Sequence, residues 1–239
     1  FDDGNGNEIT VNQNVIIDDV TDPVTPILAD VTGQCTGTAV SPTTTDNCDG
    51  VLTGTTTDAT TYTAQGTYVI TWTFTDGNGN SITANQNVII NDTTNPATPI
   101  LADVTGECTA TAVAPTTTDN CTGTITGTTT DLLTYTAQGT HVITWSFDDG
   151  NGNGITVNQN VIIDDVTDPL TPTLADITAE CTAASVVPTT TDACAGTVTG
   201  TTTDATTYST QGTHVITWSF DDGNGNTIAV NQNVIVEDT

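Results

Sequence analysis

The sequence predicts an all-β chain, organised as a tandem array of immunoglobulin-like β-sandwich repeats with about seven strands each. Three observations support this fold class. Phenylalanine recurs every 73 residues, at Phe1, Phe74, Phe147 and Phe220. Short, threonine-rich alternating segments are separated by turn signals about every 8 to 12 residues, and no helical periodicity is present. One tryptophan and two cysteines return in each complete period.

The most regular part of each period is a predicted β-hairpin, which covers 68–92 in the first complete copy. Ile70, Trp72 and Phe74 alternate with more polar neighbours, as in a strand that is half buried against a core. The Asp-Gly-Asn-Gly-Asn run that follows contains Asn-Gly, the strongest short hairpin signal, and 82–90 returns as the partner strand. We therefore expect the tryptophans to lie in the repeat cores instead of forming ligand platforms.

The period divides the chain into a short first segment and three complete repeats. We expect 1–20 to be the C-terminal hairpin and last strand of a preceding repeat. The immunoglobulin-like repeats 1, 2 and 3 are then 21–93, 94–166 and 167–239. Because the chain opens inside a repeat and lacks an initiator methionine, we interpret it as a processed product or part of a longer chain. Residues 1–20 cannot bury a core alone, so they would pair with the first repeat or be donated to a neighbour.

A joint rich in proline connects one repeat to the next, at 16–30 before the first complete repeat. Pro23 and Pro26 stiffen this joint and keep it from continuing a strand ladder. It is not a flexible Gly/Ser tether, so we expect the array to behave as a rod. Strands of about ten residues at 3.3 Å per residue, plus the joint, would advance the rod by about 35–45 Å per repeat.

The charge balance is extreme, because the chain has 29 Asp and Glu residues and no Lys or Arg. Nucleic acids and anionic membrane surfaces are excluded as partners, since both are bound through Lys and Arg. No apolar run of about 18 residues is present, which excludes a membrane-spanning helix. Repulsion among the carboxylates must be relieved by solvent, screening or bound cations.

The cysteines indicate an oxidising, extracellular location. Each repeat has two of them, and pairing within each repeat is the simplest connectivity. Each such disulfide would contribute on the order of 3 kcal/mol in the chain-entropy model. Zinc is the alternative, but two cysteines without recurring histidines provide too few ligands. The predicted pairs are Cys35 with Cys48, Cys108 with Cys121, and Cys181 with Cys194.

Acidic and amide residues recur in the joints and in the hairpin turns. The turns begin like an EF-hand loop, but Ser81 and Asn87 stand at the sixth and twelfth positions, so that loop is excluded. In an immunoglobulin-like sandwich the entering chain and the last hairpin share one end, so each joint reaches the next hairpin. Ca²⁺, which takes six to eight oxygen ligands, suits that arrangement. The alternative is that these residues only form turns and confer solubility. The predicted calcium ligands are Asp18, Asp19, Asp22, Asp76, Asn78, Asp92, Asp149, Asn151, Asp165, Asp168, Asp222 and Asn224.

No residue pattern indicates catalysis. The sequence has no nucleophile elbow, no zinc-protease helix and no phosphate-binding loop, so we expect neither an enzyme nor an organic cofactor. His141 and His214 occupy a position that is Tyr68 in the first repeat. We interpret both histidines as surface residues of a strand.

The hairpin motif resembles a known family. The matching residues are Tyr62, Gly66, Thr67, Val69, Trp72, Phe74, Asp76, Gly79, Asn80, the segment 88–92 and Pro96. Together they resemble hyaline-repeat (HYR) and related immunoglobulin-like modules. With the TDNC motif, they also resemble the tandem repeats of giant secreted surface proteins of Bacteroidota, including adhesins. The resemblance implies an extracellular array with a role in adhesion or surface structure.

The sequence therefore predicts the stalk or shaft of an extracellular surface adhesin or fibre, stiffened by disulfides and calcium. Its partners would be neighbouring repeats of the same chain, or identical chains in a fibre. One alternative is a glycan-binding module array of a secreted protein, with surface glycans as partners. Another is a self-assembling filament in which residues 1–20 donate a strand.

Overall fold

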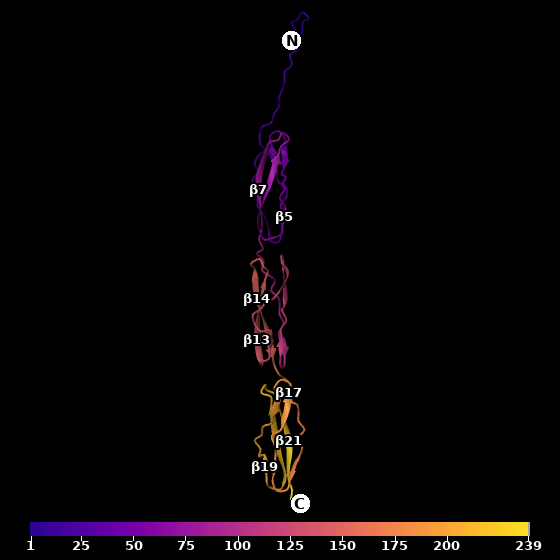
Figure 1. Ribbon diagram of the computed structural model, residues 1–239, viewed down its shortest axis with the longest axis vertical. Helices are drawn as coiled ribbons and strands as arrows, with labels where there is room; N and C mark the ends of the chain where they lie inside the picture. The colour runs from indigo at the N-terminus through magenta and orange to yellow at the C-terminus, as the bar shows by residue number, and fades with distance from the viewer. Residues whose placement is uncertain (239) are drawn as a thin grey trace. The chain divides into compact units, whose positions relative to one another are not determined.

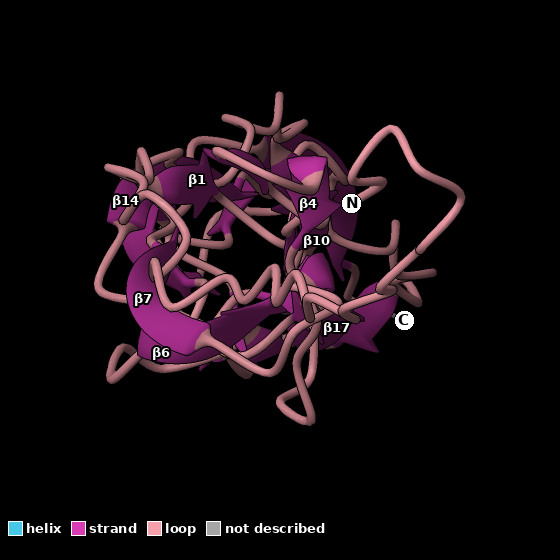
Figure 2. Ribbon diagram, turned by 90° about the horizontal axis from the view of Figure 1, so that it is seen from above, coloured by secondary structure: helices cyan, strands magenta, loops and turns pink. Residues whose placement is uncertain are grey.

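The computed structural model describes residues 1–238, and within them it contains strands and loops but no helix (Figures 1 and 2). The described residues therefore include no helix that is long and apolar enough to cross a membrane. The chain divides into two compact units, Phe1–Thr94 and Asn95–Thr239. The first unit contains one set of seven strands and the second contains two sets. The predicted all-β array of sandwich repeats is confirmed.

The strand bounds repeat with the sequence period. In the first unit they are β1 Val31–Gly33, β2 Gly37–Thr38, β3 Thr43–Asp46, β4 Gly50–Thr53, β5 Thr61–Tyr62, β6 Gly66–Thr75 and β7 Ser81–Ile90. The next set is β8 Val104–Gly106, β9 Ala110–Thr111, β10 Thr116–Asp119, β11 Gly123–Thr126, β12 Thr134–Tyr135, β13 Gly139–Asp148 and β14 Gly154–Ile163. The last set is β15 Ile177–Ala179, β16 Ala183–Ala184, β17 Thr189–Asp192, β18 Gly196–Thr199, β19 Thr207–Tyr208, β20 Gly212–Asp221 and β21 Thr227–Val236.

Each set has the same topology. In the first, β1 pairs in parallel with β7, and β7 pairs antiparallel with β6. Two further antiparallel pairs are β2 with β5 and β3 with β4. A bridge between Thr55 and Thr73 places the segment after β4 beside β6. The second hairpin strand is therefore the central strand of each three-stranded sheet, as β14 is between β13 and β8.

Alternation along the hairpin strands explains the core. Ile70, Trp72 and Phe74 are at most 1% exposed, whereas Val69 on the opposite face is 51% exposed. The indole nitrogen of Trp72 donates a hydrogen bond to the side-chain oxygen of Gln86 at 3.0 Å, so its polar atom is paired inside the core. The core position predicted for the tryptophans is confirmed, because their equivalents in the other two repeats are equally buried.

Each repeat has its own hydrophobic core, centred on one of the three tryptophans. Separate cores are typical of modules that fold largely on their own, in which stability is a sum of repeat and interface contributions. The repeat boundaries at 21–93, 94–166 and 167–239 stay predictions.

Residues 1–20 differ from the hairpins that they match in sequence. A turn forms, with a bridge between Asp2 and Glu8 and a hydrogen bond from the Ile9 amide to the Phe1 carbonyl at 2.9 Å. After that turn no strand follows, and the large apolar side chains from Ile9 to Ile17 are 63–94% exposed. A two-stranded hairpin without a third strand or a packed face is marginal in water. The assignment of this segment to a preceding repeat stays a prediction.

Candidate metal and cross-linking site between two repeats

The two cysteines of a repeat lie at opposite ends of its long hairpin. Cys108 follows β8, which pairs with the last residues of β14. Cys121 lies in the β10–β11 turn beside the β13–β14 turn, because the Thr122 hydroxyl donates to the Asp149 carbonyl at 2.7 Å. A strand of ten residues is about 30 Å long, and a disulfide needs Cα atoms within about 7 Å. Pairing within the repeat is therefore geometrically excluded.

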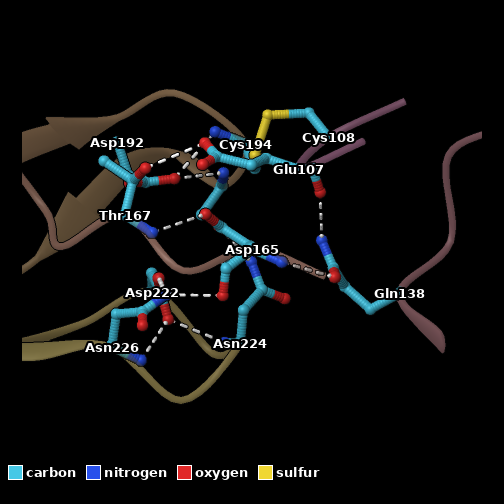
Figure 3. The surroundings of a disulfide bond; sticks show 11 residues. Glu107, Cys108, Gln138, Asp165, Thr167, Asp192, Cys194, Asp222, Asn224 and Asn226 are labelled. Carbon is cyan, nitrogen blue, oxygen red and sulfur yellow. Dashed lines mark hydrogen bonds between the residues drawn. A yellow bond between two sulfur atoms is a disulfide. The ribbon is translucent and has the colours of Figure 1, made fainter. Parts of the chain in front are cut away.

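Cys108 instead forms a disulfide with Cys194 of the following repeat, with a Cα–Cα distance of 4.9 Å (Figure 3). This corrects the predicted connectivity: a constant spacing within each repeat did not indicate pairing within it. Cys48 and Cys181 are free and exposed. Cys35 and Cys121 are disulfide-bonded. The predicted pairs Cys35–Cys48, Cys108–Cys121 and Cys181–Cys194 are all wrong.

The joint between these two repeats lies against β17. The Leu170 amide donates to the Thr191 carbonyl at 2.9 Å, and the Thr190 hydroxyl donates to the Leu170 carbonyl. Pro169, which lacks an amide hydrogen, is buried beside them. The joint is thus held to the repeat that it enters, and this places Asp165 in a buried position, 4% exposed.

The β20–β21 turn holds its own aspartate. Asp222 Oδ1 accepts hydrogen bonds from the amides of Asn224 at 2.7 Å and Asn226 at 3.1 Å, and Oδ2 accepts one from the Asn226 side chain at 2.7 Å. Burial raises the pKa of Asp222, but these hydrogen bonds outweigh it and hold the pKa below its ordinary value. The carboxylate therefore stays charged and fixes the loop conformation.

This turn contacts the joint, as Figure 3 shows. Asn224 Nδ2 donates to Asp165 Oδ2 at 3.0 Å, and Asn226 Nδ2 donates to the Asp165 carbonyl at 3.0 Å. On the side of the preceding repeat, the Asp165 amide donates to Gln138 Oε1 at 3.0 Å. The asparagines offer N–H donors instead of oxygens. Hydrogen bonds therefore stabilise one side of the buried carboxylate without a cation.

Asp192 is a candidate metal ligand that sequence reasoning missed. Its Oδ1 accepts hydrogen bonds from the amides of Cys194 at 2.7 Å and Ala195 at 2.8 Å. Its Oδ2 is buried and has no hydrogen-bond partner, and the residue is only 8% exposed. The available signal was an aspartate two residues before the second cysteine of every repeat, namely Asp46, Asp119 and Asp192.

Asp165 and Asp192 come together beside the disulfide. A carboxylate oxygen of each and the sulfur of Cys194 lie within 4.8 Å of one another. Two oxygens on opposite sides of a Ca²⁺ ion, each about 2.3–2.6 Å from it, would be about 5 Å apart. Because the Cys194 sulfur is in a disulfide, it offers no thiolate to zinc. The buried, unpaired oxygen and the all-oxygen donor pair therefore fit a hard cation.

The first unit contains the same arrangement without the cross-link. Asp19, Asp46 and Cys48 form an equivalent cluster within 4.8 Å, and Asp46 Oδ2 is buried without a partner. The Asn80 side chain donates to the Asp19 carbonyl at 3.1 Å, and the Asn78 side chain donates to Asp19 Oδ2 at 3.5 Å. A hydrogen bond to the Asp19 carboxylate, assisted by burial and nearby negative charge, raises the pKa of the Cys48 thiol.

The remaining predicted ligands lie in other surroundings. Asp18, Asp22 and Asp168 are exposed and outside these two clusters. Asp92 is buried at the end of the first unit, where its amide donates to Gln65 Oε1 at 2.8 Å. The turn residues Asp76, Asn78, Asp149 and Asn151 occupy loops like that of Asp222, each within its own unit. The structure thus brings Asp19 to Asn78 and Asp165 to Asn224, and a metal role for these residues stays a prediction.

No protein-family model and no curated protein sequence matches the chain. Among solved structures, the protocadherin gamma-B4 extracellular domain is similar at 14% identity and a TM-score of 0.32, with 90% of this chain and 49% of that chain covered. This chain thus spans about half the length of that one. Mouse cadherin-23 EC22–24 gives 12% identity, a TM-score of 0.27 and coverages of 89% and 96%. A Ca²⁺-stabilised adhesin with which an Antarctic bacterium binds ice is 18% identical, with a TM-score of 0.26. The match covers 85% of this chain and 68% of that one. Similarity at this level assigns no function to the chain.

Proposed function

We propose that the chain is a structural repeat array without enzymatic activity, which forms the stalk or shaft of an extracellular surface adhesin or fibre. The observation that carries this proposal is the junction in the second unit. There a disulfide from Cys108 to Cys194 joins two separate β-sandwiches, and two buried carboxylates lie beside it. A chain that fixes its modules to each other end by end is suited to transmit force or to hold a spacing.

Calcium at the junctions is the second part of the proposal. Asp165 and Asp192 place two carboxylates close together in a chain without a single Lys or Arg. A buried carboxylate oxygen with no partner costs about 1–3 kcal/mol or more, because its hydration is lost. Ca²⁺ would recover that cost, since it accepts oxygen ligands with flexible geometry and completes its shell with water. Asp19 and Asp46 would hold a second ion in the same way.

Location and partners follow from the chemistry of the junction. Disulfides persist in oxidising compartments, so an extracellular or cell-surface location is proposed. The resemblance of the hairpin motif to hyaline repeats of secreted bacterial surface proteins supports the same location. The partners are neighbouring repeats, in the same chain or in an identical one.

The test is a thermal melt of the oxidised chain in Ca²⁺ and in EDTA, at matched ionic strength. Occupancy at a Ca²⁺ concentration about one hundred times Kd would stabilise the folded state by about 2.7 kcal/mol. For a unit of this size the midpoint would rise by roughly 5–10 °C. Asp192→Asn is expected to remove the Ca²⁺-dependent rise in the melting midpoint of the second unit. In EDTA this variant should melt at or above the wild-type temperature, because an unpaired buried charge has been removed.

Asp168→Asn is the matched control, since it removes the same charge from an exposed position of the same joint. It should keep the full response to Ca²⁺. Equal melting temperatures in Ca²⁺ and EDTA for the wild-type chain would remove calcium from the proposal. An equal loss in both variants would show that general screening, and not a site, causes the response.

A glycan-binding array is the second candidate, and a recurring surface pocket favours it. In the last repeat the pocket has a volume of about 450 Å³, and equivalent pockets of about 400 Å³ and 320 Å³ occur in the other two. It is lined by Thr201, Thr202, Thr203, Asp204, Thr217 and Ser219. Hydroxyl groups and a carboxylate can pair with sugar hydroxyls. NMR titration with surface oligosaccharides should shift these threonine resonances, and unchanged spectra at millimolar sugar would exclude this candidate.

A further inference from the structure

The strand β6 has one edge that its own sheet leaves largely uncovered. It is the outer strand of the order β1-β7-β6, and the bridge from Thr55 to Thr73 lies on its other side. In this bridge each amide donates to the carbonyl of the other residue, at 2.9 and 2.8 Å. The backbone groups of alternate residues in an antiparallel strand point to the same side. Those of Thr71 and Val69 therefore point away from β7, as those of Thr73 do.

An aspartate takes the place of a neighbouring strand at the first of these residues. The Thr71 amide donates to Asp58 Oδ2 at 2.8 Å. Asp58 is exposed, and its own amide donates to the Thr56 hydroxyl at 3.1 Å, which holds the residue beside β6. Among the described residues, only Oδ2 of this carboxylate accepts a hydrogen bond. The other oxygen, Oδ1, can therefore receive a cation.

Beyond Asp58 the edge of β6 is open. Within residues 1–238, the backbone hydrogen bonds outside the paired strands include none to Val69 or to the Thr71 carbonyl. The Val69 side chain is 51% exposed. Unpaired N–H and C=O groups in a row are a template for the addition of another strand. This part of β6 therefore offers the hydrogen bonds that an extended chain requires.

The other two repeats have the same edge. The Thr144 amide donates to Asp131 Oδ2 at 2.8 Å, and the Thr217 amide donates to Asp204 Oδ2 at 2.7 Å. The valines that correspond to Val69 are 49% and 47% exposed. The open edge and its aspartate thus recur on β13 and β20, and one chain carries three copies of the arrangement.

We infer that each of these edges binds an extended, lysine- or arginine-rich segment of another protein as an added strand, with a cation of that segment on Asp58, Asp131 or Asp204. Charge selects this occupant. The chain has 29 acidic residues and no Lys or Arg, so a second copy would bring only like charge to the edge. This binding function is additional to the stalk and requires no Ca²⁺.

A strand also fits the edge better than a sugar does. The pocket beside the edge is lined by threonine, serine and aspartate side chains, with no aromatic ring on which a sugar could stack. The donors and acceptors of β6 have the spacing of a backbone ladder, which a peptide matches along its whole length. Hydrogen bonds from the backbone would supply affinity, and the aspartate would select basic side chains.

The first experiment measures hydrogen exchange of the wild-type chain by NMR in EDTA, without a ligand. The Val69 amide points outward and should exchange on the order of a hundredfold or more faster than the Ile70 amide, which points to β7. Equal protection of the two amides would overturn the inference, because the edge would already be covered. Protection of Val69 that rises with protein concentration would identify a second copy as the cover.

The second experiment adds a capped peptide of about eight alternating threonine and lysine residues, long enough to span the open edge at about 3.3 Å per residue. It should shift the amide signals of Val69, Val142 and Val215 and slow their hydrogen exchange, because each amide gains a carbonyl acceptor. Two peptides are matched controls. Replacement of lysine by glutamate reverses the charge, and N-methylation of the backbone amides keeps the charge but removes the donors. Neither control should slow exchange at these valines.

A pair of variants tests the aspartate in the last repeat. Asp204→Asn keeps an oxygen that can accept the Thr217 amide but removes the charge. The lysine peptide should bind about two- to fivefold more weakly at Val215, as expected for the loss of an exposed ion pair, and equally well at Val142. Asp221→Asn removes the same charge from an exposed position at the end of β20 and should leave binding at Val215 unchanged.

Three further results would overturn the inference. No slowing with the lysine peptide, although Val69 exchanges rapidly in the free chain, would mean that Asp58 closes the edge instead of receiving a partner. Equal slowing with the N-methylated peptide would mean that charge alone attracts it. Equal weakening by both variants would mean that Asp204 is not part of the site. The calcium and glycan proposals are tested separately, because EDTA is present and a sugar would shift the threonine signals of the pocket without slowing the valine amides.

Discussion

The junction around Cys194 and the free face around Cys48 share residues, turn geometry and unpaired carboxylate oxygens, yet one is cross-linked and the other is not. The difference is the presence of a preceding sandwich. The Cys194 junction has one, and it supplies Cys108 and Gln138. The site around Cys194 therefore combines residues of two successive repeats.

The segment 1–17 and the β20–β21 hairpin give the same contrast at the level of secondary structure. Their sequences are nearly the same, and both form the Asp-Asn turn. Val234 and Val236 are at most 2% exposed in β21, whereas the matching Val15 and Ile17 are 81% and 94% exposed. Strand formation in this chain thus depends on a sandwich to pack against, while the turn depends only on local hydrogen bonds.

Removal of the Cys108–Cys194 disulfide is expected to have the largest effect on stability. The double variant Cys108→Ser, Cys194→Ser opens a disulfide that spans 86 residues, and the chain-entropy model gives a loss of about 4.6 kcal/mol in the free energy of unfolding. The matched double variant Cys48→Ser, Cys181→Ser changes only free thiols and should lie within about 0.5 kcal/mol of wild type. Urea unfolding under non-reducing conditions measures both. Equal losses would contradict the assigned connectivity.

Removal of the hydrogen bond between the β20–β21 turn and the joint is expected to reduce stability by a smaller amount. Asn224→Ala removes the partly buried 3.0 Å bond to Asp165, and we expect a loss of about 1 kcal/mol. Asn78→Ala removes the longer, exposed 3.5 Å bond to Asp19 and should cost only a few tenths of a kcal/mol. The two urea midpoints, compared at pH 7 in EDTA, report the difference. A larger loss for Asn78→Ala would mean that the free face is the better ordered one.

Much of the fold was predictable, because the relevant signals are local. Alternation at Ile70, Trp72 and Phe74 identified the core strand, and the Asn-Gly turn identified its partner. The meeting of joint and hairpin was also expected, since it follows from sandwich topology. The cysteine pairing was not predictable, because it depends on the length of β14, which separates Cys108 from Cys121 by most of a repeat. Asp192 was missed because only tertiary packing leaves its Oδ2 buried and unpaired.

The smallest expected effect is on the pH dependence of unfolding in the acid range. Hydrogen bonds hold the pKa of Asp222 below its ordinary value despite the opposing effect of burial, so its contribution to stability is present above the unfolded pKa of about 3.9. That contribution is lost as the pH falls through the lower, folded pKa. Between roughly pH 5 and pH 2.5, the urea midpoint of Asp222→Asn should therefore fall less steeply than that of the wild-type chain.

Asp3 provides the comparison for this prediction. The Asn7 side chain and nearby backbone amides also lower the pKa of Asp3, but its turn belongs to no sandwich. Asp3→Asn should therefore leave the pH profile of unfolding unchanged. NMR titration should still find both carboxyl groups below their ordinary pKa. An ordinary pKa at Asp3 would show that the sandwich, and not the turn, causes the shift.

Small-angle X-ray scattering of the oxidised chain, in Ca²⁺ and in EDTA, tests the central claim most directly. Repeats that advance by about 35–45 Å each predict a maximum dimension of at least about 100 Å and the scattering of a stiff rod in Ca²⁺. In EDTA the same chain should show a broader distribution of interatomic distances. A flexible or compact profile in Ca²⁺ would contradict the account, because the junctions would then not hold neighbouring repeats in a fixed orientation.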